Sequence, residues 1–231
     1  MLKAIIFDFN GVILNDEPLH FQSMCDTVAN VGLRITREEY WSEYLPLDDA
    51  SCLEKIGRNH SYQFSDGEQQ RLLELKADYY RKLLQDQYPL FPGAAEFVRT
   101  AASRYPLALA SGARREEIEG TLQATGLSHF FRVIAAAEDF TLGKPHPESY
   151  LFALERLNAS LNGQISHIQP QECLVIEDSI GGVQGARAAG MRCLAMTNTY
   201  PKESLTGADE IASSFCHVNL EELERLWQES F

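Results

Sequence analysis

The sequence predicts an α/β protein whose core is a Rossmann-like parallel sheet flanked by helices, with an inserted α-helical cap domain. A short apolar run at residues 4–7 has no helical period, which suits a central parallel strand covered on both faces. Residues 16–87 then show helical patterning and no clear strand, and beyond them apolar runs alternate with helical segments, which indicates βαβ units. We therefore expect a core domain made of residues 1–14 and 91–231, and a cap domain made of residues 15–90.

The inserted segment contains recognisable helix signals. A helix is expected from about residue 16 to residue 31, because a proline stands in its first turn and a glycine follows its end. Thr36 and Ser65 each open a capping-box pattern, with a glutamate three residues later. Apolar residues then recur at helical spacing over residues 68–85, and Pro92-Gly93 ends the helical block.

The remainder of the chain alternates between the two kinds of element. Helices are expected at residues 94–104, 114–125, 147–157, 183–189 and 220–228, and strands at residues 107–110, 133–136, 173–176 and 193–196. Residues 158–172 form a longer and more polar connection than a usual loop, which suggests a surface excursion.

Composition narrows the classes of partner and compartment. The 231 residues carry a net charge of −13, so nucleic acid and anionic membranes are not expected as partners. The five cysteines show no paired spacing, which fits a reducing compartment. No leader-like segment and no apolar run long enough to span a bilayer is found. We expect a cytoplasmic monomer.

Polar or charged residues follow three of the apolar runs, and a lysine stands in a proline-rich loop. These positions are Asp8, Ser111, Lys144 and the pair Glu177-Asp178. Open α/β sheets bind ligands at the carboxyl ends of their strands, which makes these residues candidates for a site. Each also has a simpler explanation. Asp8 could form an Asx turn and Asp178 could cap a helix, Ser111 could belong to an ordinary turn, and Lys144 could be an exposed surface lysine.

The chain contains, in this order, the motif Phe-Asp-x-x-Gly-Val, a strand-end serine, the motif Gly-Lys-Pro and the motif Glu-Asp-Ser-x-x-Gly. Together these resemble the motifs of the haloacid dehalogenase superfamily. The likeness covers nearly the whole chain and is greatest to the β-phosphoglucomutase-like and phosphoglycolate-phosphatase-like branch. It implies that Asp8 attacks phosphorus as a nucleophile. It also implies that Mg²⁺ is bound by Asp8, the backbone carbonyl of Asn10 and Asp178, with Glu177 as an outer-sphere acid or a partner of Lys144.

The same resemblance assigns the groups that hold the phosphoryl oxygens. Ser111 and the amides of Gly112 and Ala113 would donate hydrogen bonds to them, and Lys144 would add a positive charge opposite Asp8. Such neutralisation is needed because the negative oxygens of a phosphate ester repel an anionic nucleophile.

Asn10 departs from the family pattern, which has a second aspartate there. That aspartate protonates the leaving oxygen and later activates water, whereas an amide cannot act as a general acid or base near neutral pH. Three hypotheses remain open. The substrates have good leaving groups, a water or a cap residue relays the proton, or Asn10 traps a bound state.

The cap domain should carry substrate specificity. His20 could reach the substrate or be a solvated helix histidine. Lys76 matches in position a cap lysine of β-phosphoglucomutase-like proteins, but the sequence favours a plain charged helix face for it. Asp48 and Asp49 occupy the region where the mutase pattern has an arginine that grips a second phosphate. An acid there would repel a bisphosphate, which argues against a sugar phosphomutase.

The leading hypothesis is a Mg²⁺-dependent phosphatase that acts on a small phosphorylated metabolite through an aspartyl phosphate. The alternative from another class is a catalytically weak phosphoryl-ligand binding protein, in which Asn10 marks lost chemistry. A phosphomutase ranks third. A dehalogenase is disfavoured because it would not need the acid pair Glu177-Asp178, and a phosphonatase is disfavoured because Lys76 is the one doubtful candidate for its Schiff-base lysine.

Overall fold

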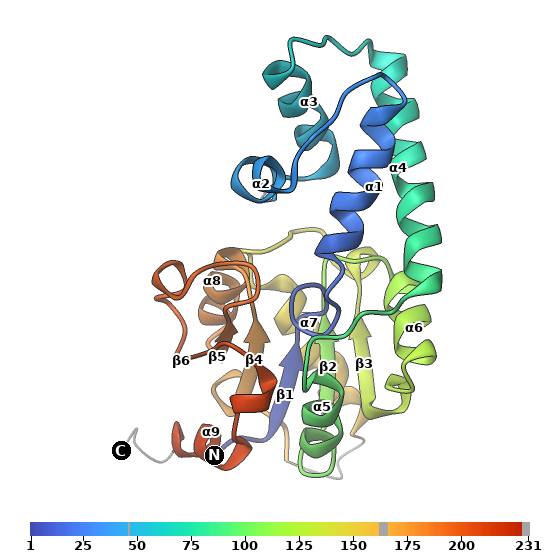
Figure 1. Ribbon diagram of the computed structural model, residues 1–231. Helices are drawn as coiled ribbons and strands as arrows, with labels where there is room; N and C mark the ends of the chain where they lie inside the picture. Colours follow the sequence, from blue (N-terminus) through green and yellow to red (C-terminus); the bar gives the residue numbers. More distant parts are fainter. Residues whose placement is uncertain (46, 162–165, 228–231) are drawn as a thin grey trace. The chain divides into compact units, whose positions relative to one another are not determined.

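The computed structural model describes residues 1–45, 47–161 and 166–227 of the chain (Figure 1). The chain divides into two compact units. Residues 1–15 and 89–231 form the sheet unit, and residues 16–88 form the helical unit. Residues 162–165 of the predicted polar connection and residue 228 at the end of the last predicted helix lie outside the described residues.

Six parallel strands form a single sheet in the order β3-β2-β1-β4-β5-β6 (Figure 1). The strands are β1 (Ala4–Phe7), β2 (Leu107–Ala110), β3 (Phe131–Ala135), β4 (Cys173–Glu177), β5 (Arg192–Met196) and β6 (Glu210–Ala212). β1 pairs with β2 on one side and with β4 on the other, so the strand order reverses direction at β1. The predicted Rossmann-like parallel sheet is confirmed. Ligands of such sheets bind at this switch point.

Helices connect the strands and flank the sheet. They are α5 (Ala94–Ala102), α6 (Arg115–Ala124), α7 (Glu148–Ser160), α8 (Ile180–Ala188) and α9 (Leu220–Arg225). Short 3₁₀ turns lie at Ser128–Phe130, Ala137–Asp139, Pro170–Glu172, Lys202–Ser204 and Phe215–His217.

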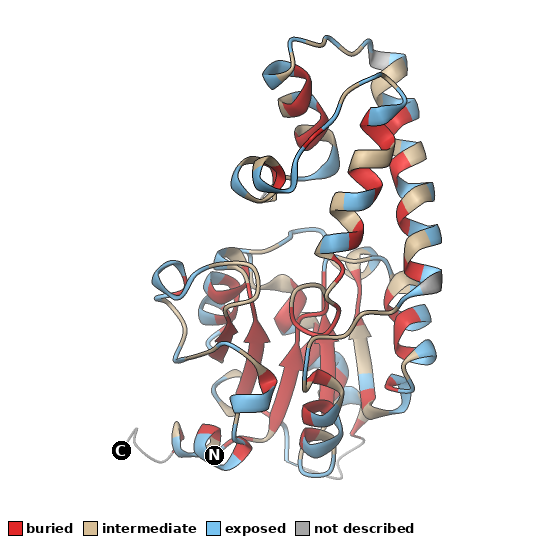
Figure 2. Cartoon of the chain, in the orientation of Figure 1, coloured by how far each residue is buried: buried red, intermediate tan, exposed pale blue. Residues whose placement is uncertain are grey.

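The central strand is buried on both faces, as its uninterrupted apolar run predicted (Figure 2). Successive side chains of a strand point to opposite faces. Ile6 accordingly belongs to a cluster that includes Tyr150 of α7 and Val183 of α8. The ring of Phe7 meets Phe97 of α5 edge to face, with ring centroids 6.1 Å apart. Helices on both faces therefore fix β1 and, with it, the residue that follows the strand.

Two strand predictions need correction. β3 begins at Phe131, two residues before the predicted start, and β6 was not predicted. Glu210, Ile211 and Ala212 are exposed or half-buried, because β6 lies at the edge of the sheet. Three residues with only one large apolar side chain do not form a recognisable apolar run. These residues form a strand because they pair with β5, and this tertiary contact cannot be recognised from the local sequence.

The helical unit contains α1 (Glu17–Ala29), α2 (Arg37–Glu39), a π-helical turn (Tyr40–Tyr44), α3 (Asp49–Asn59) and α4 (Asp66–Asp86). Thr36 Oγ1 accepts from the Glu39 amide at 3.1 Å, and the Glu39 carboxylate accepts from the Thr36 amide at 3.3 Å, which confirms the predicted capping box. Ser65 caps α4 in the predicted place. Among the described residues of this unit, every assigned element is a helix.

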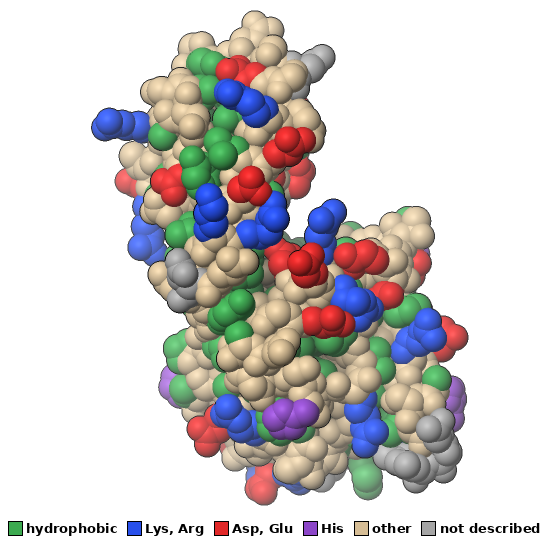
Figure 3. Space-filling view, turned by 90° about the vertical axis from the view of Figure 1, so that its right-hand side faces the viewer, with side chains coloured by type: hydrophobic (Ala, Val, Ile, Leu, Met, Phe, Trp, Pro, Cys, Tyr) green, Lys and Arg blue, Asp and Glu red, His purple; other side chains and the backbone are tan. Residues whose placement is uncertain are grey.

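The surface carries mixed charges. On the face shown in Figure 3, acidic and basic side chains are interspersed, so the net charge of −13 is not gathered into one acidic area of this face. Within the described ranges, no helix combines the length and the apolar character that crossing a membrane would require.

Candidate active site

The residues predicted for the site meet at one edge of the sheet. Asp8 directly follows β1, Ser111 follows β2, and Glu177 ends β4 with Asp178 after it. These three strands are neighbours and parallel, so their carboxyl ends lie at the same edge. All four side chains are buried, although each is charged or polar. Such groups are costly to bury unless they are paired. The sequence therefore placed these four residues correctly at a common edge.

Three carboxylates form the centre of this edge. One oxygen each of Asp8, Glu177 and Asp178 lies within 4.8 Å of the others. The carboxylate of Asp178 packs against the backbone of Gly11, where a Cβ would lie 2.1 Å from Oδ2. Gly11 also has a φ of +77°, a conformation that favours glycine. The Asn10-Gly11 turn is thus shaped to admit the Asp178 carboxylate.

Lys144 joins two of these acids. Its Nζ lies 2.5 Å from Asp8 Oδ1 and 2.5 Å from Glu177 Oε1. The Tyr150 hydroxyl also donates to Glu177 Oε1, at 2.7 Å. Lys144 is therefore not an exposed surface lysine, and the alternative explanation for it is wrong. Its charge is held between the candidate nucleophile and Glu177.

Both carboxylate oxygens of Glu177 accept hydrogen bonds from other groups of the protein. Its Oε2 accepts from the amides of Asp178 and Ser179 at 2.9 Å each and from the Ser179 hydroxyl at 3.0 Å. With Lys144 and Tyr150 on the other oxygen, Glu177 fits the predicted role of a partner of Lys144 better than that of a direct metal ligand. Ser179, and not Asp178, caps α8, so the explanation of Asp178 as a helix cap is also wrong.

Burial and charge shift the pKa values of the cluster in different directions. Burial, together with the charge of Glu177, raises the pKa of Asp8 to about 7 despite the nearby Lys144. Burial and the charges of two neighbouring acids, Glu177 and Asp8, raise the pKa of Asp178 well above its ordinary value. Burial would also raise the pKa of Glu177, but the charge and hydrogen bonds of Lys144 lower it overall. Asp8 and Asp178 are thus both harder to ionise than ordinary aspartates, although Lys144 lies beside Asp8.

The donor set fits a hard divalent cation. In the described part of the chain, three clustered carboxylates face the ammonium group of Lys144, which cannot balance the charge of all three. Oxygen ligands of this kind are those that Mg²⁺ prefers. Among the described residues, the acid cluster contains no histidine or cysteine that would favour a softer metal. Asp8 and Asp178 are the two carboxylates that remain for such an ion.

The loop after β2 carries the residues predicted to hold a phosphoryl group, Ser111, Gly112 and Ala113. The Ala113 amide donates to Ser111 Oγ at 3.1 Å, so in this structure that amide is engaged within the loop. Because Ser111 Oγ accepts this bond, its own hydrogen remains available as a donor. Gly112 is exposed, and a Cβ there would meet nothing within 4 Å, so the space beside it is open.

Asn10 lies in a tight turn that directly follows Asp8. The amides of Ile13 and Leu14 both donate to the Phe9 carbonyl, at 2.8 and 3.0 Å, and the Gly11 amide donates to the Leu14 carbonyl at 3.0 Å. Asn10 itself is half-buried. The turn therefore holds residue 10 two positions from the candidate nucleophile, on the same rigid loop.

Two further residues, from the segment after β5, contact Asp178 and the turn after β1. The Thr199 hydroxyl donates to Asp178 Oδ2, and Asn198 Nδ2 donates to the Gly11 carbonyl at 2.7 Å. Sequence reasoning missed both, although the polar stretch Thr197-Asn198-Thr199 follows an apolar run as the other site residues do. Tyr150 was missed because nothing in the sequence distinguishes it from an ordinary core tyrosine of α7.

The two predicted cap residues contact each other inside the helical unit. Lys76 is only 2% exposed, and its Nζ lies 2.6 Å from His20 Nδ1 and 2.8 Å from Asp49 Oδ1. His20 Nε2 lies 3.2 Å from Asp16 Oδ2, and the Tyr80 ring stacks on the imidazole with centroids 4.2 Å apart. Lys76 is therefore not part of a plain charged helix face, and that explanation is wrong. Its charge is balanced within the unit by Asp49.

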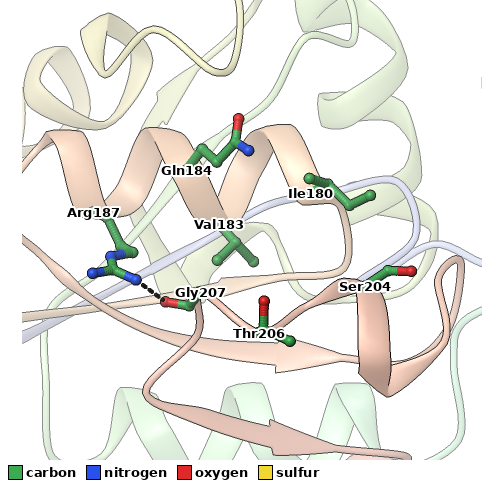
Figure 4. A pocket seen from close by; sticks show the side chains of 7 residues that line it. All are labelled: Ile180, Val183, Gln184, Arg187, Ser204, Thr206 and Gly207. Carbon is green, nitrogen blue, oxygen red and sulfur yellow. Dashed lines mark hydrogen bonds between the residues drawn. The ribbon is translucent and has the colours of Figure 1, made fainter.

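A surface pocket of about 390 Å³ lies elsewhere in the sheet unit, between α8 and the segment after β5 (Figure 4). Val183 and Ile180 of α8 line it together with Ser204 and Thr206, and the Arg187 guanidinium donates to the Gly207 carbonyl at 3.3 Å. None of the predicted site residues lines this pocket. It provides a place for control substitutions that do not touch the acid cluster.

Fold and site together define a Rossmann-like protein with a strand-end aspartate, a bridging lysine and an acid pair. The profile of the haloacid dehalogenase-like hydrolases matches residues 2–190. A CbbY protein of Rhodobacter capsulatus is 31% identical over 216 residues, which are 90% of this chain and 91% of that protein. The chain therefore belongs to the haloacid dehalogenase-like hydrolases, as the motifs predicted.

Other relatives differ in length and name. Protein SUPPRESSOR OF QUENCHING 1 of Arabidopsis thaliana is 30% identical over 211 residues, which are 90% of this chain but 19% of that much longer protein. The chain thus spans about a fifth of that relative. The fructose-1-phosphate phosphatase YqaB of Escherichia coli is 27% identical over 188 residues, covering 81% of this chain and 93% of that protein.

Solved structures share the fold over nearly the full chain. The β-phosphoglucomutase of Clostridium difficile has a TM-score of 0.77 at 26% identity and covers 99% of this chain and 98% of its own. An aspartate-to-asparagine mutant of CbbY from Rhodobacter sphaeroides, crystallised with xylulose-1,5-bisphosphate, has a TM-score of 0.75 at 26% identity and covers 95% of this chain and 97% of its own.

Proposed function

We propose that the protein is a Mg²⁺-dependent phosphatase that hydrolyses a small phosphorylated metabolite through an aspartyl phosphate. One observation carries this proposal. The Asp8 carboxylate stands at the end of the central strand with Lys144 at 2.5 Å, and two more acids complete the cluster. The names of relatives such as the fructose-1-phosphate phosphatase support the reaction class. The helical unit, in this proposal, is the cap domain.

Mg²⁺ would be held by Asp8, Asp178 and the backbone carbonyl of Asn10. The first two are the buried carboxylates whose pKa values are raised by burial and by neighbouring acids, and a bound cation would offset both effects. A bound Mg²⁺ would supply positive charge that offsets the negative phosphoryl oxygens. Glu177 would not coordinate it directly, because its oxygens already accept hydrogen bonds from Lys144, Tyr150 and the start of α8.

The protein's own groups have distinct tasks in the first step. An Asp8 oxygen forms a bond to phosphorus while the bond from phosphorus to the leaving oxygen breaks. Lys144 lowers the pKa of Asp8 against the effect of burial, because an adjacent ammonium favours the charged, nucleophilic carboxylate. The Ser111 hydroxyl, whose oxygen accepts from the Ala113 amide, donates its hydrogen to a phosphoryl oxygen. In the second step water attacks the aspartyl phosphate and releases inorganic phosphate.

Asn10 limits the proton transfers of both steps. Its amide can donate a hydrogen bond to the leaving oxygen but cannot deliver a proton to it. It also cannot remove a proton from the attacking water. The proposal therefore favours substrates whose leaving group needs no proton, such as aryl or acyl phosphates, and predicts a slow second step.

We further propose that His20 and Lys76 bind the leaving group of the substrate. Asp49, by pairing with Lys76, would disfavour a leaving group that carries a second phosphate. Lys76 is almost fully buried and already paired with Asp49 at 2.8 Å, so its charge is not free to attract a second phosphate. A monophosphate with hydroxyl groups suits this environment better than a bisphosphate does. The same contact speaks against a phosphomutase, which must hold two phosphates.

A second candidate function is a phosphoryl-ligand binding protein with little turnover. Asn10 is the observation that favours it, because this residue type removes the acid–base group while leaving Lys144 and Ser111 to bind a phosphoryl group. The asparagine mutant of the Rhodobacter sphaeroides CbbY, whose structure contains a sugar bisphosphate, is compatible with this candidate.

A phosphatase screen separates the two candidates. Alkyl, aryl and acyl monophosphates are assayed with Mg²⁺ and with a chelator, using the wild-type protein and the near-isosteric variant Asp8→Asn. The phosphatase proposal expects Mg²⁺-dependent phosphate release that Asp8→Asn abolishes. Release that persists in Asp8→Asn would contradict the proposed nucleophile. Tight binding of phosphorylated compounds without release of phosphate from any of them would favour the binding protein.

A further inference from the structure

The segment that follows β5 contacts both the loop after β1 and one acid of the cluster, Asp178. Thr197 is anchored to the sheet, because its amide donates to the Ala212 carbonyl of β6 at 2.9 Å. The next two side chains turn toward the cluster. Asn198 Nδ2 donates to the Gly11 carbonyl at 2.7 Å, and the Thr199 hydroxyl donates to Asp178 Oδ2. One short segment thus holds the loop after β1 and the acid after β4.

The contact with Thr199 fixes the Asp178 carboxylate. Its Oδ2 accepts the hydroxyl hydrogen on one side, and the group packs against the Gly11 backbone on the other. When Asp178 is ionised, as it is when it binds a cation, this becomes a charge-assisted hydrogen bond, which is stronger than a neutral one. With Oδ2 engaged in this way, Oδ1 is the oxygen that remains free of Thr199. The carboxylate is therefore set in one orientation before any ligand arrives.

The Asn198 contact acts on the loop that carries residue 10. Gly11 has a φ of +77°, and its amide already donates to the Leu14 carbonyl at 3.0 Å. A direct hydrogen bond to its carbonyl fixes the peptide that follows Asn10, and so limits how the turn after Asp8 can move. Both polar side chains of the segment are half-buried, which leaves these bonds partly shielded from water.

We infer that Thr199 is a positioning residue that presents one oxygen of Asp178 to a divalent cation, and that Asn198 fixes the turn after Asp8 for the same purpose. This inference rests on the proposed Mg²⁺ site. Neither residue would touch the substrate or the cation. Hydrogen bonds that orient metal ligands in this way typically contribute about 10–100-fold to metal affinity or activity.

A purely structural role for Thr199 makes different predictions. If the hydroxyl only stabilised the loop, its loss would lower the melting temperature and leave Mg²⁺ affinity unchanged. If it orients Asp178, its loss weakens Mg²⁺ binding, and any retained hydroxyl restores it. The variants Thr199→Val and Thr199→Ser separate these cases, because valine keeps the shape and serine keeps the hydroxyl. Thr206→Val is the matched control, since Thr206 lies on the Figure 4 pocket away from the acids.

The test is calorimetric titration of the full chain with MgCl₂ alone, without substrate, next to a thermal melt of each variant. We expect Thr199→Val to weaken Mg²⁺ binding by about 10–100-fold, with Thr199→Ser within about threefold of wild type and Thr206→Val unchanged. Asn198→Ala should weaken binding in the same direction. In turnover assays, saturating Mg²⁺ should recover most of the kcat of Thr199→Val, because the substitution removes orientation and not a reacting group.

The outcomes distinguish this inference from the proposed function. Suppose that the wild-type protein binds Mg²⁺ and that Asp178→Asn does not. Unchanged Mg²⁺ affinity in Thr199→Val would then overturn the role of Thr199 and leave the Mg²⁺ site standing. Failure of Thr199→Ser to rescue binding would overturn it as well. Absence of Mg²⁺ binding in the wild-type protein would overturn the metal site and with it this inference. If Thr199→Val unfolds, Thr199→Ala provides the same measurement without the added methyl group.

Discussion

Replacing Asn10 by aspartate tests whether residue 10 limits proton transfer. Asn10 is half-buried on the rigid turn two positions after Asp8, so Asn10→Asp places a carboxyl group near the leaving oxygen without changing the size of the side chain. Lys144 and Asp178 keep their places, and substrate affinity should change little. The variant differs from the wild-type protein in one chemical capacity, which is the ability to give and take a proton.

The expected gain follows from the chemistry of the leaving group. A positioned general acid or base contributes about 10²–10⁴-fold to rate, and an alkyl phosphate needs the full contribution because an alkoxide is a poor leaving group. Burial and the negative charge of Glu177 raise the pKa of Asp8 to about 7, and a carboxyl group at position 10 of the same loop should likewise favour its protonated form. We expect at least about a tenfold increase in kcat for alkyl phosphates.

The assay compares two substrate classes with the same pair of proteins. In single-turnover experiments, transfer from an aryl phosphate to the protein should be nearly equal in wild type and Asn10→Asp, because a phenolate leaves without a proton. Transfer from an alkyl phosphate should be faster in the variant. An equal gain for both classes would point to a change in positioning, and no gain for alkyl phosphates would show that another group carries the proton. His20→Ala in the wild-type background would then be the next variant to measure.

Four further predictions follow from the contacts of the site. Lys144→Met should reduce kcat by about 10²–10³-fold, measured with an aryl phosphate, because it removes the ammonium group that lies 2.5 Å from the nucleophile. An effect on KM alone would contradict this role. Asp178→Ala should weaken Mg²⁺ binding in calorimetry by at least about tenfold, and unchanged affinity would place the metal elsewhere. The pKa of Asp8 is raised from 3.8 to about 7, so its contribution to stability is present below pH 3.8 and lost as pH rises through about 7. The melting temperature of the metal-free protein should fall between pH 5 and pH 8 relative to that of Asp8→Asn, and parallel curves would refute the shift. Asp49→Ala frees the charge of Lys76 and should lower the inhibition constant of a bisphosphate relative to a monophosphate by about tenfold, whereas an unchanged ratio would remove Asp49 from specificity.

The central part of the fold was predictable because its signals are local. The apolar run at residues 4–7 ends at Asp8, and full burial on both faces of β1 is what such a run indicates. Strand-end positions then brought Ser111 and the pair Glu177-Asp178 to one edge, since parallel neighbouring strands share that edge. These inferences need no knowledge of distant contacts beyond the order of the strands.

Other features depend on tertiary contacts that no local pattern encodes. β6 takes its conformation from pairing with β5, and the burial of Lys76 follows from its contacts with His20 and Asp49 on two other helices. The sequence favoured an exposed position for Lys76 because a lysine among polar neighbours usually is exposed. Thr199 could have been found by extending the strand-end rule to β5, but which acid it would meet depends on the order of β4 and β5 in the sheet.

The measurement that tests the central claim most directly is mass spectrometry of the wild-type protein, quenched in acid during turnover of an aryl phosphate with Mg²⁺. Because Asn10 cannot activate the attacking water, the phosphorylated form should accumulate, and its added phosphoryl group should map to Asp8. The variant Asp8→Asn should carry no such group. Steady release of phosphate with Asp8 unmodified at every time point, or a phosphoryl group on another residue, would contradict the covalent mechanism.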